Sequence, residues 1–102
     1  MDDKEFDALA AAALARIETG LDAADADFEQ PGAGILEVDD GHGGKLIVNR
    51  HNVAREIWIA AKSGGFHFRY DGQHWRDTRD GSELFGKLAA LLAAHAELDV
   101  SF

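Results

Sequence analysis

Carboxylates crowd the segment from residue 18 to residue 29, where the chain carries Glu18, Asp22, Asp25, Asp27 and Glu29. Clustered carboxylates without histidine or cysteine suit hard, oxygen-preferring cations such as iron, manganese, calcium or magnesium. Carboxylates on an exposed helix edge cannot close a full coordination shell, so we expect weak and easily exchanged binding. The alternative is a solvated acidic face that keeps the protein soluble and monomeric.

Two of these acids, Glu18 and Asp22, work against the helix that should carry them. They are four residues apart, so they share a helix face and repel each other by a few tenths of a kcal/mol. They also lie in the last turn, where the helix dipole disfavours negative charge, whereas acids in the first turns complement it. An arrangement that opposes stability, with no basic residue nearby, indicates a function.

The histidines offer a second candidate site. If Asp71-Gly72 forms a two-residue hairpin turn, Arg69 faces His74 and His67 faces Arg76. His67 and His74 would then lie close together and could bind a soft metal or haem iron. The alternative is scattered surface histidines, because no pair has the spacing of a zinc site.

Nucleophilic catalysis finds little support in the sequence. The chain has no cysteine and no G-x-S-x-G elbow, and its serines fall in turn, cap and tail contexts. The glycine clusters at residues 41–44 and 64–65 join expected strands instead of opening helices, so they do not cradle phosphate. We therefore expect a protein that is not an enzyme.

Composition and charge bound the class of protein. The 102 residues, 46% hydrophobic and 28% charged, are typical of one soluble domain spanning 1–102. The net charge is −9, and the first forty residues hold twelve acids against two bases. Such a surface repels nucleic acid and anionic lipid and attracts cations or a basic protein. No apolar run spans a bilayer, and the acidic start lacks the features of a secretory or mitochondrial leader, so we expect a cytoplasmic location.

The elements that must position these residues follow from periodicity. Residues 3–22 carry an apolar stripe at helical spacing, which Gly20 and the acidic stretch to Pro31-Gly32 should end. Alternation then predicts strands over 35–39, 45–50, 56–62, 66–70 and 73–77. A second helix runs from an N-cap at Ser82 to about residue 95. This order predicts an α+β, two-layer α-β sandwich: an antiparallel sheet of five to six strands with both helices on one face.

The other face of that sheet should meet water, and the alternation predicts what it displays. Ile57 and Ile59 are the better core candidates, so Trp58 should point outward. An exposed tryptophan on a sheet face indicates a binding surface. The alternative is a parity slipped by one residue, which would place Trp58 in the core.

Several of these features occur together in one known family. The stretch Asn49-Arg50-His51, the strand Ile57-Trp58-Ile59, the Gly64-Gly65 turn and the later run from Asp71 to Trp75 resemble the signature of the frataxin family. The resemblance is to the bacterial branch known as CyaY. With the acidic first helix and the terminal Val100-Ser101-Phe102, it covers essentially the whole chain.

The resemblance implies a function as well as a fold. Members of that family bind iron weakly through an acidic ridge, and they bind the cysteine desulfurase of iron–sulfur cluster assembly beside its scaffold. The ridge would comprise Glu18, Asp22, Asp25, Asp27 and Glu29, joined by Glu37, Asp39 and Asp40. The partner-facing sheet surface would centre on Asn49 and Trp58, with Glu18 and Asp22 also toward the partner. We expect a monomer in the absence of iron.

The chain departs from the family pattern along its first helix. Densely acidic relatives pair carboxylates there, whereas here Thr19 and Gly20 follow Glu18, and alanines follow Asp22. Iron affinity and stoichiometry therefore do not carry over from the family. The thinned ridge could serve chiefly as an electrostatic dock for a basic partner surface.

Overall fold

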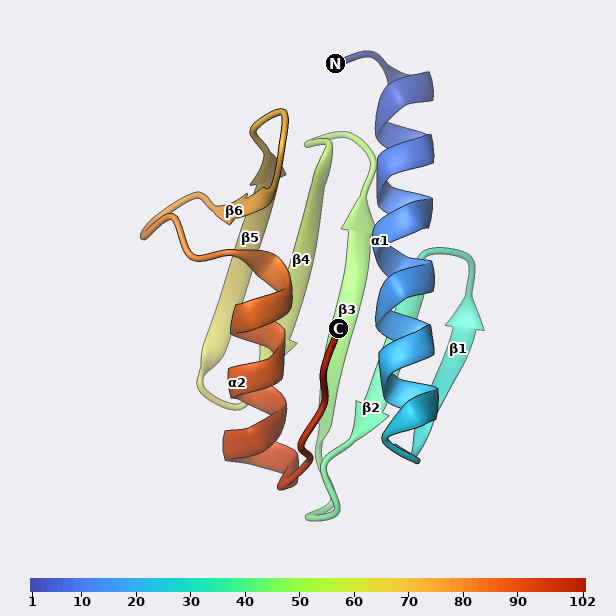
Figure 1. Cartoon of the computed structure of the whole chain (residues 1–102), viewed down its shortest axis with the longest axis vertical. Coiled ribbons are helices and arrows are strands. Elements are labelled where there is room, and N and C mark those ends of the chain that lie inside the picture. The colour runs from blue at the N-terminus through green and yellow to red at the C-terminus, as the bar shows by residue number, and fades with distance from the viewer.

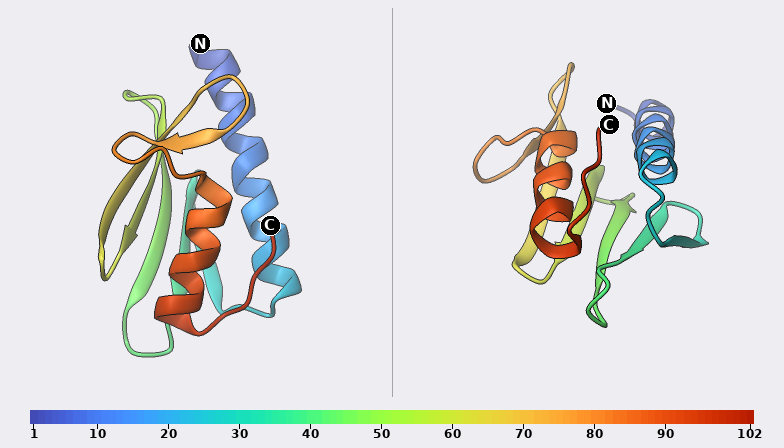
Figure 2. Two further views of the ribbon diagram at one scale, coloured as in Figure 1. Left: turned by 60° about the vertical axis from the view of Figure 1, so that its left-hand side comes forward. Right: turned by 60° about the horizontal axis from the view of Figure 1, so that its bottom comes forward.

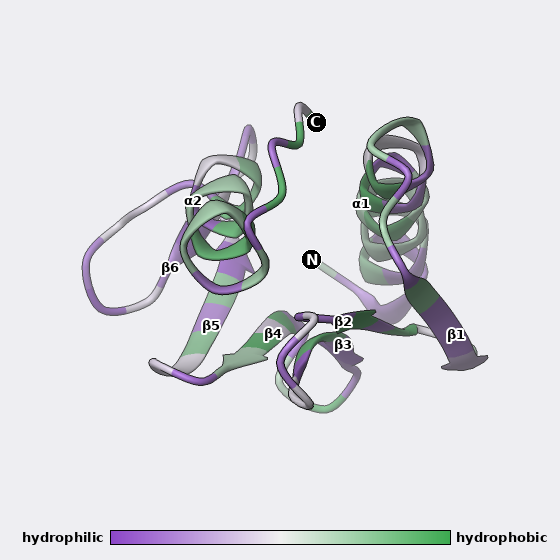
Figure 3. Cartoon of the chain, turned by 90° about the horizontal axis from the view of Figure 1, so that it is seen from below, coloured by the Kyte–Doolittle hydropathy of each residue, from purple (hydrophilic) through white to green (hydrophobic).

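Two helices lie side by side on one face of a six-stranded antiparallel sheet (Figure 1). A computed structural model describes all residues from Met1 to Phe102. The strands form a meander in the order β1-β2-β3-β4-β5-β6, so each strand pairs with its neighbour in sequence. Seen from below, both helices sit above the sheet and its other face carries no element (Figure 3). The predicted α+β sandwich is confirmed, and we call the uncovered side the open face.

The elements run along the chain without long connections. The helices are α1 (Asp3–Ala23) and α2 (Leu84–Ala96). The strands are β1 (Phe28–Gly32), β2 (Ile35–Asp39), β3 (Lys45–His51), β4 (Glu56–Ala61), β5 (Gly64–Tyr70) and β6 (Trp75–Asp77). Neither helix is long and apolar enough to cross a bilayer.

The first helix passes through Gly20 and ends at Ala23, so the expectation that this glycine ends the helix is wrong. Gly20 instead makes room for the end of the chain, because a Cβ there would lie 2.5 Å from Cδ1 of Phe102. The C-terminal segment runs back between the two helices (Figure 2). Arg16 Nη2 donates to the Phe102 carbonyl over 2.9 Å. Gly20 lowers the helix propensity of α1, but its lack of a side chain allows Phe102 to pack against the helix.

The strand β1 is the element that the alternation missed. Its residues are mostly exposed, and it carries Pro31 and a register irregularity between Glu29 and Gly32. An edge strand tolerates proline because one side of its backbone has no strand to pair with. With only one partner strand and little burial, β1 had no reason to show an alternating hydrophobic pattern.

The hairpin between β5 and β6 differs from the two-residue turn predicted at Asp71-Gly72. Arg69 pairs with Arg76, and Tyr70 pairs with Trp75, so the loop holds four residues. Asp71 closes it, because its Oδ1 accepts from the backbone N–H of Gln73 at 2.9 Å and of His74 at 2.8 Å. The register moves by two residues, which preserves the faces of the paired residues such as Arg69 and Arg76 but leaves His74 in the loop.

The second helix begins one residue later than predicted. Its N-cap is Glu83, whose carboxylate accepts from the N–H groups of Phe85 at 2.8 Å and Gly86 at 3.0 Å. Ser82 is a favoured cap type, but its own N–H donates to Asp80 Oδ1 at 2.8 Å. The hydroxyl and N–H of Ser82 hold the pKa of Asp80 below its usual value.

The core lies between the helices and the inner face of the sheet and contains nineteen buried apolar residues. Ile57 and Ile59 are both buried there. Trp58, between them, projects from the open face and is half-buried. The predicted parity of β4 is therefore confirmed, and the alternative that placed Trp58 in the core is wrong.

Candidate functional site

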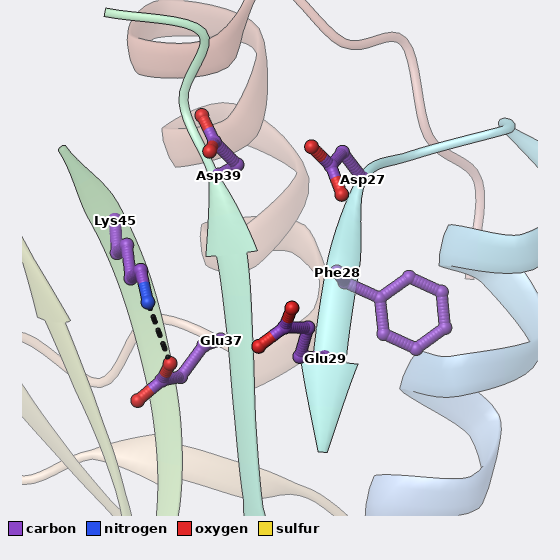
Figure 4. A pocket seen from close by; sticks show the side chains of 6 residues that line it. All are labelled: Asp27, Phe28, Glu29, Glu37, Asp39 and Lys45. Carbon is purple, nitrogen blue, oxygen red and sulfur yellow. Dashed lines mark hydrogen bonds and ion pairs between the residues drawn. The ribbon is translucent and has the colours of Figure 1, made fainter. Parts of the chain in front are cut away.

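Four carboxylates gather where β1 and β2 meet, on the open face of the sheet (Figure 4). Asp27 precedes β1, Glu29 lies on it, and Glu37 and Asp39 come from β2. Glu29 and Glu37 are direct cross-strand partners, and the backbone carbonyl of Asp27 accepts the backbone N–H of Asp39 at 2.9 Å. The surface dips here into a hollow of about 120 Å³ that Phe28 and Lys45 also line. We call these six residues the acidic hollow.

Lys45 is the one cation in the acidic hollow. Its Nζ lies 2.9 Å from Oε1 of Glu37, and the hydrogen bond to Glu37 raises the pKa of the ammonium above its ordinary value. Like charges directly opposite one another destabilise a sheet, so Lys45 offsets part of the Glu29–Glu37 repulsion. One lysine against four carboxylates leaves a surplus of negative charge.

The remaining predicted ridge acids lie along the neighbouring segment. Glu18 and Asp22 are on the last turns of α1, and Asp25 follows the helix in a left-handed conformation with φ of 55°. None of the three lines the acidic hollow. The thinned ridge thus has two parts, a helical part and the hollow.

The carboxylates as arranged do not form a chelating site. No three histidine, aspartate or glutamate side chains converge closely enough to hold a metal ion. Asp22, Asp25, Asp27 and Glu29 are exposed, so cations reach them from solvent. This donor set fits loose, exchangeable association with a hard cation and does not fit a tightly held resident metal.

Asp40 has a structural part to play that its position in the sequence did not reveal. Its side chain is buried, and Oδ1 accepts from the N–H groups of His42 at 2.7 Å and Gly44 at 3.0 Å. These two backbone hydrogen bonds hold the pKa of the carboxyl below its usual value. Asp40 therefore closes the turn between β2 and β3, and it is not among the residues that line the acidic hollow.

His67 and His74 are not brought together. His67 lies on β5 and stacks on Trp58 with ring centroids 4.2 Å apart. His74 lies in the four-residue loop and lines a groove with Leu9 and Ala13 of α1. The prediction that they meet across a two-residue hairpin is wrong because the register differs. Because the two histidines do not meet, the structure does not support a haem or metal site between them.

Asn49 and Trp58 lie side by side on the open face, as direct partners on β3 and β4. The indole of Trp58 is enclosed by two imidazoles, since His51 stacks on its other side at 3.9 Å. A hollow of about 180 Å³ opens beside it, with Ala60 and Gly65 among its lining residues. Small residues on neighbouring strands thus leave the edge of the indole accessible.

Sequence reasoning missed three residues of these sites: Lys45 beside Glu37, His51 stacked on Trp58, and Glu56, whose Oε1 accepts the Trp58 Nε1–H over 2.8 Å. Glu56 lies two residues before Trp58, and a period of two places both on one face of a strand. The sequence could therefore have placed Glu56 on the same face of the strand as Trp58. The contacts of Lys45 and His51 depend on the register between strands, which the sequence pattern left open.

Comparison with known proteins agrees with this architecture. The profile of the Frataxin-like domain matches residues 1–98. The iron–sulfur cluster assembly protein CyaY of Dechloromonas aromatica is 56% identical over 98 residues, covering 94% of this chain and 93% of that protein. The protein of the same name from Cupriavidus pinatubonensis is 45% identical over 102 residues, covering 95% and 92%.

A solved structure shows the same fold. Frataxin from Psychromonas ingrahamii superposes with a TM-score of 0.90 at 29% identity, covering 99% of this chain and 97% of that one. The match includes both helices and the sheet, since it spans nearly the whole chain. The chain therefore belongs to the frataxin-like family, in its CyaY branch.

Proposed function

We propose that this protein binds iron weakly as Fe²⁺ or Fe³⁺, docks on the cysteine desulfurase, and modulates iron–sulfur cluster assembly in the cytoplasm. Its role is to regulate and deliver, and the desulfurase and scaffold carry out the covalent chemistry. The relatives' names support the assembly role. The observation that supports both iron binding and docking is the acidic hollow. Its four carboxylates face solvent, and Lys45 is the one cation among them.

The geometry of the acidic hollow supports transient binding of iron better than iron storage. A hard cation would find oxygen donors from Asp27, Glu29 and Asp39 without a closed cage around it. Metal affinity in such sites depends on ligand charge and rigidity. An open, solvent-facing set therefore favours fast exchange, which a protein that passes iron onward needs.

The docking part of the proposal uses the same face of the sheet. Glu37 and Asp39 project from the open face on β2, and Asn49 and Trp58 project from it on β3 and β4. A basic surface on the partner would be drawn to the acids, and the half-buried tryptophan is a typical interface anchor. Glu18, Asp22 and Asp25 extend the negative field beyond the sheet edge.

An anaerobic titration of ferrous iron, followed by ¹H–¹⁵N NMR, tests the iron part. Paramagnetic broadening should begin at Asp27, Glu29, Glu37 and Asp39 and should saturate only at millimolar iron. The double variant Asp27→Asn with Glu29→Gln should lose most of that broadening, while the matched pair Asp2→Asn with Glu5→Gln, at the far end of α1, should keep it. Broadening centred on His67 and His74 would contradict the proposal.

A further inference from the structure

Glu56 is a buried carboxylate on the side of the sheet that faces solvent. Its residue exposure is 5%, although it lies on the same face as Trp58 and Ala60. The side chains of Trp58, His67 and Arg69 surround it. A charged group is rarely buried without partners, so the contacts of Glu56 define its role.

Both oxygens of Glu56 are used, each by a different residue of the open face. The indole Nε1–H of Trp58 donates to Oε1 over 2.8 Å. Arg69 Nη2 donates to Oε2 over 2.6 Å. His67 Nδ1 lies 3.8 Å from Oε1. One carboxylate therefore links neighbouring strands β4 and β5 and sets the Trp58 ring and the Arg69 guanidinium relative to one another.

The indole is also held on both of its flat sides. His51 stacks at 3.9 Å with an interplanar angle of 14°, and His67 stacks at 4.2 Å with an angle of 7°. The ring of His51 is itself oriented, because its Nδ1 accepts the backbone N–H of Ala54 at 3.1 Å. Stacking restricts the tilt of the indole, and the hydrogen bond to Glu56 holds the edge that carries Nε1–H.

Stability alone does not account for this carboxylate. Burying a charge carries a desolvation cost, and an apolar side chain of similar volume often replaces a buried ion pair without loss. The apolar core is on the opposite side of β4, where Ile57 and Ile59 are fully buried. A leucine or methionine at position 56 would therefore fit the sheet.

We propose that Glu56, itself held by Arg69, is a positioning residue that fixes Trp58 in the geometry used for docking, so that the partner meets an ordered anchor. This inference rests on the proposed function, because it assigns Glu56 a part in the same docking surface. An anchor that is ordered before binding loses less conformational freedom when the complex forms. Glu56 itself, covered by its neighbours, need not touch the partner.

The test combines a spectroscopic readout with binding to the cysteine desulfurase. In Glu56→Leu the Trp58 Nε1–H resonance should shift upfield and broaden, while the resonance of the buried Trp75 stays in place and reports an intact core. Affinity should fall about tenfold, the scale of ordering one side chain. Glu56→Gln keeps an acceptor for the indole and should keep both the resonance and most of the affinity. If Glu56→Leu does not fold, Glu56→Met serves in its place.

A double-mutant cycle shows whether Glu56 acts through the indole. Trp58→Phe lacks the N–H donor, so Glu56→Leu should cost little further affinity in that background. An equal loss in both backgrounds, or wild-type affinity in Glu56→Leu, would overturn the inference. Trp58→Ala distinguishes failure of the positioning role from failure of the proposed docking. If Trp58→Ala binds weakly while Glu56→Leu binds normally, only the positioning role of Glu56 fails. If Trp58→Ala binds normally, docking through this face fails as well.

Discussion

Lys45 is the residue that sets how much negative charge the acidic hollow offers to a cation. Its ammonium is hydrogen-bonded to Glu37 at 2.9 Å and faces solvent beside three further carboxylates. A metal ion that used Glu37 as a ligand would have to share it with this ammonium or displace it. Under the proposed function, Lys45 would compete with iron for Glu37 and keep iron binding weak.

Replacing Lys45 with methionine should tighten ferrous iron binding about two- to fivefold, the scale of an exposed ion pair. The change removes a positive charge and frees Glu37 without altering the length of the side chain greatly. Iron affinity measured by anaerobic titration checks this result. Lys62→Met, at an exposed lysine outside the hollow, is the matched control. Equal affinities of Lys45→Met and the wild type would argue against competition.

Asp40 provides a pH-dependent contribution to stability at the turn between β2 and β3. Hydrogen bonds from the His42 and Gly44 N–H groups lower the pKa of its carboxyl in the folded protein. A lowered folded-state pKa adds stability above the unfolded value of about 3.9 and loses it as the pH falls. Asp40→Ala should therefore be less stable than the wild type at pH 7, and the gap should shrink below about pH 4.

Urea denaturation at pH 7, 5 and 3 measures that gap directly. Asp99→Ala, at an exposed carboxylate near the C-terminus, should show almost no gap at any of these values. A difference between Asp40→Ala and the wild type that stays constant down to pH 3 would show that the charged form of the carboxyl is not what stabilises the turn.

At the scale of the elements, α1 packs against the C-terminal segment at Gly20. Alanine in place of a helix-interior glycine normally stabilises by about 1 kcal/mol. Here its Cβ would lie 2.5 Å from the Phe102 ring and 3.1 Å from the Ser101 carbonyl oxygen. Gly20→Ala should therefore displace the tail and lose the contact between Phe85 and Phe102, so the full gain should not appear.

Thermal denaturation of a four-member cycle tests this coupling. Phe102→Ala removes the obstructing ring, and in that background Gly20→Ala should recover most of the stabilisation expected from propensity. A gain of about 1 kcal/mol from Gly20→Ala in the otherwise wild-type chain would show that the tail does not constrain the helix.

The elements also show where sequence reasoning succeeds and where it stops. Hydrophobic periodicity gave both helices and the strands from β2 to β5, because each buries one face against the common core. It missed β1, which is exposed and has a single partner strand. It misjudged the β5–β6 loop and the start of α2, where the Asp71 and Glu83 carboxylates bind nearby backbone N–H groups. Such local hydrogen bonds leave no periodic trace.

The same limit applies to the candidate site: the pattern within one strand was predictive, but contacts between strands were not. The outward position of Trp58 followed from parity within one strand, and its pairing with Asn49 agrees with that parity. The acidic hollow needed the register of β1 on β2, which sets Glu29 opposite Glu37. The meeting of His67 with His74 was misjudged because it depended on a turn length. Contacts across strands therefore require the structure, while the face of a single residue does not.

At the scale of the whole molecule, the two faces of the sheet differ in what covers them. The helices cover one face of the sheet (Figure 3). The open face carries both the acidic hollow and the hollow beside Trp58. A partner that docks on the open face can therefore contact the acids and the aromatic anchor at once. Long-range attraction from the acids would speed encounter, and the anchor would set the lifetime of the complex.

Binding to the cysteine desulfurase, measured at several salt concentrations, tests this account most directly. Asp27 and Glu29 are exposed, so Asp27→Lys with Glu29→Lys should leave the fold intact. We predict that this pair weakens binding at least tenfold at low salt and flattens the dependence on salt, mainly through slower association. The control pair Glu5→Lys with Asp99→Lys, which changes the net charge equally, should bind within about twofold of the wild type. Wild-type affinity in the Asp27–Glu29 pair, or equal losses in both pairs, would contradict the account.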